Sequence, residues 1–195
     1  MSKFEDKVAI VTGSATGIGY GISKRLSSEN IKIIMVDYDG NMAEQSAGEL
    51  IAKGGDVEVV IGDVSLPETA EEAVQAATSK WGHIDILVNN AGIGGTNGNI
   101  WELDVEELDR VYRTNLRGVF TFCNKTIPIM LENDYGRIVK YSLYSRKGGQ
   151  PSNGSLFSHQ SCSHRSHQIH RKRIGWYRRT GKLYYSSRCA NKNSR

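Results

Sequence analysis

Cysteine is scarce in this chain, and long hydrophobic runs are missing altogether. The chain has only three cysteines, an odd number without a C-x-x-C pair, at Cys123, Cys162 and Cys189. This pattern argues against disulfides and a zinc site, and it favours a reducing compartment such as the cytoplasm. The first residues lack the apolar stretch of a signal peptide, and no run approaches the ~18 residues of a membrane span. We therefore expect a cytoplasmic protein without a metal ion or a membrane segment.

Acidic residues are absent from residues 140–195, although the whole chain contains 21 of them. The same stretch holds 13 of the 25 lysines and arginines and four of the five histidines. Residues 1–139 carry the other 12 basic residues and all 21 acidic ones, so the overall charge of +4 conceals a charge of −9 followed by one of +13. Because two compositions meet near Lys140, we divide the chain into a domain, residues 1–139, and a basic tail, residues 140–195.

Strand-like and helical patterns alternate through the first part of the chain. The predicted strands are Lys7–Thr12, Ile31–Val36, Val57–Ile61, Ile84–Val88 and Arg137–Val139. The predicted helices between them are Gly17–Ser28, Met42–Lys53, Pro67–Trp81 and Val105–Leu131, the last of which we divide into two helices. Such alternation predicts right-handed crossovers and a parallel sheet that is covered on both faces. The expected fold is an α/β, Rossmann-type doubly wound sheet that remains incomplete, with about five strands.

The alternation stops after Val139. The tail has no sustained helical or strand period and no apolar run longer than two or three residues. Nothing in it can offset the entropy cost of ordering a core, so we expect the tail to be irregular or disordered.

A glycine-rich turn follows the first predicted strand. It lies between the apolar run Val8–Val11 and a helical pattern from Ile22, and it reads Thr12-Gly13-Ser14-Ala15-Thr16-Gly17-Ile18-Gly19. A strand that turns through glycines into a helix directs backbone N–H groups and the positive helix end to one point, where a pyrophosphate can bind. The next apolar run ends in Asp37, whose carboxylate can accept hydrogen bonds from the ribose hydroxyls of adenosine and repel a 2′-phosphate. Together these features predict NAD as the cofactor, with NADP less favoured.

With these motifs in this order, the chain resembles the short-chain dehydrogenase/reductase family, and within it the 3-oxoacyl-carrier-protein-reductase-like branch. The resemblance covers residues 5–139, a little over half of such a protein. The matching motifs are Thr12–Gly19, Asp37, Asp63-Val64, Asn89-Asn90-Ala91-Gly92, Arg113–Phe120 and Gly136–Val139. An intact relative is expected to be a homo-oligomeric oxidoreductase that moves hydride between NAD(H) and a small alcohol or ketone.

The resemblance also implies roles for individual residues. The implied cofactor-binding residues are Gly13, Ser14, Thr16, Gly17, Ile18, Gly19, Asp37, Asp63, Val64, Asn90, Ala91 and Gly92. Among them, Asp63 and Val64 would flank the adenine, and residues 90–92 would line the nicotinamide side. Asn89 would mainly tie strands together. Asn115 would be one of four catalytic residues, kinking a helix and holding a water in a proton relay.

The other three catalytic residues of the family are missing. The family has a serine shortly after the fifth strand, a tyrosine thirteen residues on, and a lysine four residues beyond it. The tyrosine acts as general acid or base, and the nearby ammonium lowers its pKa toward the working pH. The one Tyr-x-x-x-Lys here, Tyr20 to Lys24, follows the glycine turn in the wrong part of the fold. We therefore expect no dehydrogenase turnover from the chain as written.

The tail can be read in a shifted frame. When each codon is read one nucleotide later, the residues after Val139 can become N-I-A-S-I-A-G-K-E-G-N-P, a typical continuation for the family. Serine becomes possible at Leu143, tyrosine at Leu156-Phe157 and lysine at Gln160-Ser161, at the spacing that the family requires. The single codon of tryptophan forces a glycine at Trp176-Tyr177. We therefore interpret residues 140–195 as out-of-frame translation.

Two other interpretations of the tail remain. At face value it is a basic arm on a non-catalytic dinucleotide-binding fragment, and it binds nucleic acid or an anionic surface, although it lacks a recognisable nucleic-acid-binding motif. A zinc site could draw on His159, His164, His167 and His170. No cysteine or acid completes that set, so we predict no metal and no specific nucleic-acid partner.

Cys123, on an apolar helix, is predicted to be a packed thiol rather than a nucleophile.

Overall fold

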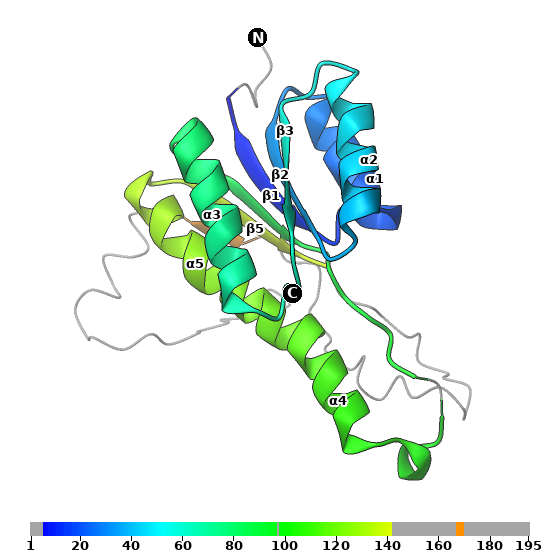
Figure 1. The fold of residues 1–195 in the computed structure, drawn as a ribbon. Helices are drawn as coiled ribbons and strands as arrows, with labels where there is room; N and C mark the ends of the chain where they lie inside the picture. Colours follow the sequence, from blue (N-terminus) through cyan, green and yellow to red (C-terminus); the bar gives the residue numbers. More distant parts are fainter. Residues whose placement is uncertain (1–5, 97, 142–166, 170–195) are drawn as a thin grey trace, which may run out of the picture.

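The computed structural model describes residues 6–96, 98–141 and 167–169, and Figure 1 shows their arrangement. Five parallel strands form the centre of the molecule, in the spatial order β3-β2-β1-β4-β5. They are β1 (Val8–Thr12), β2 (Lys32–Asp37), β3 (Val57–Ile61), β4 (Ile86–Asn89) and β5 (Gly136–Lys140). From β1 at the centre, the chain first adds β2 and β3 on one side and then β4 and β5 on the other. This arrangement confirms the predicted Rossmann-type sheet of about five parallel strands.

Helices cover both faces of this sheet (Figure 1). On one face lie α1 (Gly17–Ser27) and α2 (Gly40–Ile51), and on the other lie α3 (Pro67–Trp81) and α5 (Val119–Glu132). Every residue of β1 is buried, and so is every residue of β2 except the first. Burial on both faces explains why these strands are nearly continuous apolar runs rather than alternating ones.

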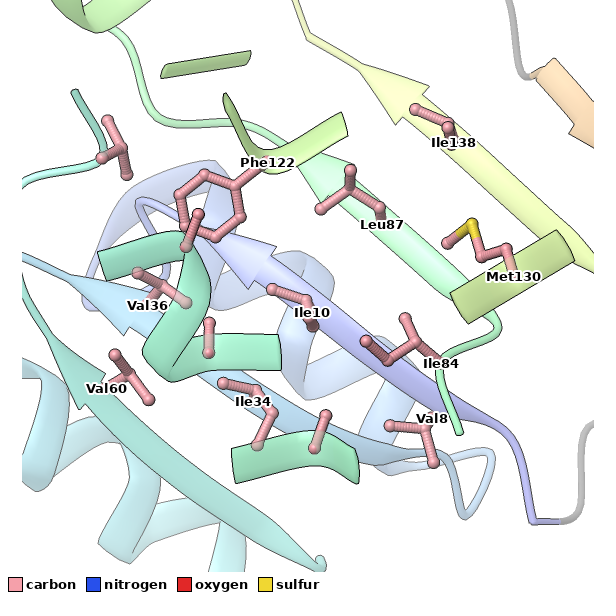
Figure 2. Close-up of a cluster of buried hydrophobic side chains, with 14 residues drawn as sticks. Val8, Ile10, Ile34, Val36, Val60, Ile84, Leu87, Phe122, Met130 and Ile138 are labelled. Carbon is pink, nitrogen blue, oxygen red and sulfur yellow. The ribbon is translucent and has the colours of Figure 1, made fainter. Parts of the chain in front are cut away.

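Alternate strand residues supply two separate cores. Ile10 of β1 and Ile34 of β2 point to the side of α3 and α5, where Phe122 and Met130 of α5 join the same cluster (Figure 2). The residue after Ile10, Val11, points to the opposite face and packs in the cluster under α1 and α2. Full burial of one such side chain stabilises the fold by about 1.5–3 kcal/mol.

The expected division of residues 105–131 into two helices is present in the structure, although no loop separates the two. α4 (Val105–Tyr112) continues through a π turn, Arg113–Gly118, directly into α5. Tyr112 and Val119, on either side of this turn, both keep right-handed helical backbone angles. A π turn widens a helix locally without ending it, and such turns are frequent at functional sites. The α4 end of this long helix projects beyond the sheet (Figure 1).

The tail contributes one strand that the sequence analysis does not predict. β6 (His167–Ile169) pairs with β5 in antiparallel orientation, with His167 opposite Ile138. Three residues carry no readable period, and their pairing depends on the free edge that β5 offers. The other predictions for the tail concern residues 142–166 and 170–195, which lie outside the described residues.

The described residues contain neither a candidate membrane span nor a candidate metal-binding cluster. In that part of the chain, no helix combines the length and the apolar character that a bilayer crossing requires. Within the same residues, no three His, Cys, Asp or Glu side chains gather as ligands for a metal ion.

Candidate functional site

Most of the predicted site residues lie at one edge of the sheet, where the carboxyl ends of the parallel strands meet. The glycine turn follows β1, Asp37 ends β2, Asp63 lies just beyond β3, and Asn90 follows β4. β1 and β4 are neighbours, while the strands that come next in the chain lie outward on opposite sides. Open parallel sheets bind their ligands at such a switch point.

Glycines shape the turn after β1. Gly13 and Gly17 have φ angles of 63° and 56°, in the left-handed region that favours glycine. Gly19 serves a different purpose, because a Cβ atom there would lie 1.9 Å from the Gly13 carbonyl oxygen. The first turn of α1 therefore packs against the loop more closely than any other residue at position 19 allows.

The amino end of α1 is open to solvent. Thr16, Gly17 and Ile18 are exposed, and the first turn of α1 contains no acidic residue. The first N–H groups of a helix have no partner within the helix, and they carry the positive end of its dipole. This end can therefore bind an anion. Ser14, by contrast, is fully buried, and its hydroxyl donates to the carbonyl oxygen of Val36 at 3.3 Å, so its side chain faces the sheet.

Asp37 is nearly buried, with 7 % of its surface exposed. One carboxylate oxygen, Oδ2, accepts a hydrogen bond from the Ala15 N–H at 2.8 Å, and the other accepts one from the Asp39 N–H at 3.2 Å. Ser46 of α2 donates its hydroxyl to the Ala15 carbonyl oxygen at 2.7 Å. Each carboxylate oxygen has a second lone pair, so Asp37 can still accept bonds from ribose hydroxyls.

The two asparagines at the end of β4 have different surroundings. Asn89 ties β4 to β5 through its carbonyl oxygen, which accepts a hydrogen bond from the Tyr141 N–H at 2.9 Å. The side chain of Asn90 makes a further link: its Nδ2 donates to the carbonyl oxygens of Thr12 and Gly13 at 3.0 and 2.9 Å. Asn89 is buried and points its amide toward the Cys123 sulfur at 3.6 Å. Asn90 thereby holds the end of β4 against the glycine turn.

Asp63 and Val64 have opposite surroundings. Asp63 is exposed, and its carboxylate accepts a hydrogen bond from the Ser65 N–H at 2.8 Å. Val64 is buried, and a Cβ atom on Gly118 of the π turn would come within 3.1 Å of it. The Val64 side chain therefore supports the π turn, and Asp63 is the member of the pair that faces solvent.

Asn115 lies in the π turn and contacts the loop that leaves β4. Its Oδ1 accepts a hydrogen bond from the Ile93 N–H at 2.8 Å, and its Nδ2 donates to the Ile93 carbonyl oxygen at 2.9 Å. A Cβ atom on Gly92 would lie 3.2 Å from Oδ1 of Asn115, so this approach is tight. The structure thus brings Asn115 next to Gly92 and Ile93, and its side chain fixes the backbone of this loop.

A second contact holds the same loop, and sequence reasoning missed it. Glu107 of α4 accepts a hydrogen bond from the Thr96 N–H, and the Arg110 guanidinium donates to both of its carboxylate oxygens at 2.8 Å. The hydrogen bond from Arg110, followed by the one from Thr96, lowers the pKa of Glu107 to about 2. Spacing of three residues along a helix was the available signal for the Glu107–Arg110 pair.

Two other candidate reactive groups have unfavourable surroundings. The Tyr20 hydroxyl donates to Glu49 at 2.6 Å, and this hydrogen bond raises the pKa of Tyr20. A catalytic tyrosine needs the opposite shift, which agrees with the expectation that Tyr20 and Lys24 lie in the wrong part of the fold to act as the family's catalytic pair. Cys123 packs against the core, and burial raises its pKa, so the predicted packed thiol is confirmed.

Comparison with known proteins gives a consistent result. The family described as short chain dehydrogenase matches residues 7–156, so the match continues past Val139, where the resemblance was expected to stop. The 7alpha-hydroxysteroid dehydrogenase of Bacteroides fragilis is 35 % identical over 161 residues, which cover 80 % of this chain and 61 % of that protein. The chain thus spans about three fifths of that relative.

Solved structures of short-chain oxidoreductases and related reductases are also similar to this chain. The 3-ketoacyl-(acyl-carrier-protein) reductase from Brucella melitensis, complexed with NADH, is 42 % identical, with a TM-score of 0.63 over 68 % of this chain and 53 % of that one. A metagenomic short-chain oxidoreductase in complex with NADP is 26 % identical, with a TM-score of 0.72 over 80 % of this chain and 71 % of that one.

Proposed function

Since the chain belongs to the short-chain dehydrogenase family, we propose that residues 6–141 are the dinucleotide-binding half of an oxidoreductase acting on an alcohol or ketone. One observation carries this proposal. Three features lie together at the switch point between β1 and β4. They are the open amino end of α1, the buried carboxylate of Asp37, and the hydrogen bond from Asn90 to the glycine turn. The adenosine ribose, the pyrophosphate and the nicotinamide would follow this edge in that order, at the ends of β2, β1 and β4.

The residues of this chain hold and orient the cofactor. The exposed N–H groups of residues 16–18 would bind the pyrophosphate, and Asp37 would accept the ribose hydroxyls. The backbone of residues 90–92 would line the nicotinamide side, where Asn115 keeps it in place through Ile93. The cofactor, when bound, supplies the hydride that passes to or from the substrate carbon.

NAD(H) is the proposed cofactor, with NADP(H) disfavoured. Asp37 ends β2 with a carboxylate next to the turn, and a 2′-phosphate placed there would meet a negative charge. The 3-ketoacyl-(acyl-carrier-protein) reductase from Brucella melitensis was solved with NADH, which agrees with this choice. The metagenomic relative was solved with NADP, so the family alone does not decide between the two.

The chain as written is proposed to lack the proton-transfer residues of the reaction, because its reading frame slipped near Lys140. Apart from Tyr20, no tyrosine of the sequence is followed by a lysine four residues later. The shifted reading restores a serine, a tyrosine and a lysine at the family's spacing. The nucleotide sequence of codons 139–177 tests this: read one base later, it should spell the restored residues. Codons that spell anything else would contradict the frameshift.

Direct binding tests the dinucleotide site. NADH fluorescence should change on titration with the purified full-length chain, and ADP should displace the bound NADH, because the pyrophosphate and ribose contacts lie in the described residues. An absence of binding under conditions where circular dichroism shows the α/β fold would refute the proposed function.

A further inference from the structure

Ala15, in the middle of the glycine turn, is held through its backbone from two sides. Its N–H donates to Oδ2 of Asp37 at 2.8 Å, and its carbonyl oxygen accepts the Ser46 hydroxyl at 2.7 Å. All three residues are nearly buried, with Ala15 2 % exposed and Asp37 and Ser46 both 7 % exposed. The two bonds therefore form in a protected place, where water competes poorly for the same groups.

The turn needs such fixing because its glycines leave the backbone free. Gly13 and Gly17, on either side of Ala15, both adopt positive φ angles, and glycine populates many alternatives to these. The beginning of the turn is held by the bond from the Gly13 N–H to the Val36 carbonyl oxygen at 2.8 Å. Ala15 is the last buried residue before the exposed positions 16–18. Its orientation therefore determines where the N–H groups of those positions point.

We propose that Ser46 is a positioning residue for the pyrophosphate: with Asp37 it clamps Ala15, and the clamp aims the N–H groups of residues 16–18 at the phosphates. This inference rests on the proposed dinucleotide function. Ser46 belongs to α2, well away in sequence from the glycine turn, and no motif marks it. Asp37 then has two tasks, since it would accept the ribose hydroxyls and also hold the turn.

The test compares Ser46→Ala with a matched control in the full-length chain. Ser46→Ala removes the hydroxyl that holds Ala15. Thr126→Val removes another buried hydroxyl, which donates to the Phe122 carbonyl oxygen at 2.8 Å within α5, away from the turn. Two readouts are needed: the Kd for NADH from fluorescence titration, and amide hydrogen exchange at Ala15 compared with Ile34 in the core.

Ser46→Ala should weaken NADH binding about fivefold, the change expected from losing one net hydrogen bond. Exchange should become faster at Ala15 and stay unchanged at Ile34, because the core keeps its contacts. Thr126→Val should leave both readouts as they are. Unchanged NADH affinity in Ser46→Ala, or unchanged exchange at Ala15, would overturn the inference while the proposed function stands. A lack of NADH binding by the unsubstituted chain would instead refute the proposed function, and the positioning role with it.

Discussion

At the scale of single residues, the Asp37 carboxylate combines two demands. Buried carboxylates need partners for their oxygens, and Asp37 has the N–H groups of Ala15 and Asp39. Its charge would also select against a 2′-phosphate. Because the structural bond to Ala15 and the expected ribose contact share one side chain, a simple truncation would remove both at once.

Two substitutions of Asp37 should separate these effects. Asp37→Asn keeps an oxygen that can accept the Ala15 N–H and removes the charge, whereas Asp37→Ala removes both. The asparagine variant should bind NADH about tenfold more weakly and lose its discrimination against NADPH, since hydrogen bonds to charged groups are the stronger ones. The alanine variant should bind both dinucleotides more weakly still, because the turn loosens. Fluorescence titration with each dinucleotide measures this, and equal affinities in the two variants would show that the Ala15 bond is irrelevant to binding.

Gly19 and Gly21 offer a matched pair on α1. A Cβ atom at position 19 would meet the Gly13 carbonyl oxygen at 1.9 Å, whereas position 21 has nothing within 4 Å. Gly19→Ala should therefore destabilise the fold by about 1–3 kcal/mol, typical of overpacking, and abolish NADH binding. Gly21→Ala should stabilise by about 0.5–1 kcal/mol, because glycine is costly inside a helix. Thermal unfolding and NADH titration check both; a Gly19→Ala variant with unchanged affinity would contradict the close packing.

At the scale of elements, the connection from β4 to α4 is fixed at two points by one long helix. Asn115 holds the backbone of Ile93, and Glu107 holds the N–H of Thr96. Both residues face the same loop, which borders the proposed nicotinamide side. The π turn accommodates this, because its extra residue changes the angular position of Asn115 relative to Glu107.

The Glu107 contact should resist acid. Its pKa is lowered to about 2, first by the hydrogen bond from Arg110, so the contact contributes fully above the ordinary range of a glutamic acid and is lost as the pH falls toward 2. Carbon-13 NMR of the Glu107 carboxyl should show its titration near that value. In Arg110→Ala the midpoint should move up toward the ordinary glutamic acid value. A midpoint that stays in place would mean that Arg110 does not control Glu107.

At the scale of the whole molecule, the chain joins a well-packed α/β half to a tail of different composition. The described half buries both faces of its central strands. The tail contributes one antiparallel edge strand, β6, to the described sheet. By the family resemblance, a catalytic serine, tyrosine and lysine would belong to the stretch that follows β5, where the charge pattern of this chain changes.

The protein should therefore bind NADH without oxidising alcohols. General acid–base catalysis contributes about 10²–10⁴, and catalytic residues that act as a unit are lost together, so turnover should fall below detection. NADH formation with a panel of alcohols measures this, and a gene with one nucleotide removed at codons 139–141 serves as the positive comparison. Robust turnover by the unaltered protein would contradict the proposed loss of the proton-transfer residues.

The sequence by itself determined the order of strands and helices and the glycine turn, because these depend on local patterns. An apolar run such as residues 8–11 favours a buried strand, and the missing side chain of Gly19 permits a tight turn. Both effects are local and do not depend on residues far away in the sequence. The sequence predicted two helices within residues 105–131 but not the π turn that joins them, because a π turn keeps helical backbone angles and the residue pattern does not mark it.

Only the tertiary structure decided which side chains fix the site. Asn89 and Asn90 are adjacent in sequence, yet one points toward α5 and the other toward the turn after β1, because successive residues at a strand end face opposite ways. Ser46 reaches Ala15 across 31 positions, and Asn115 reaches Ile93 across 22. Such contacts depend on how α2 and α5 pack against the sheet, and packing is a property of the assembled layers rather than of any one segment.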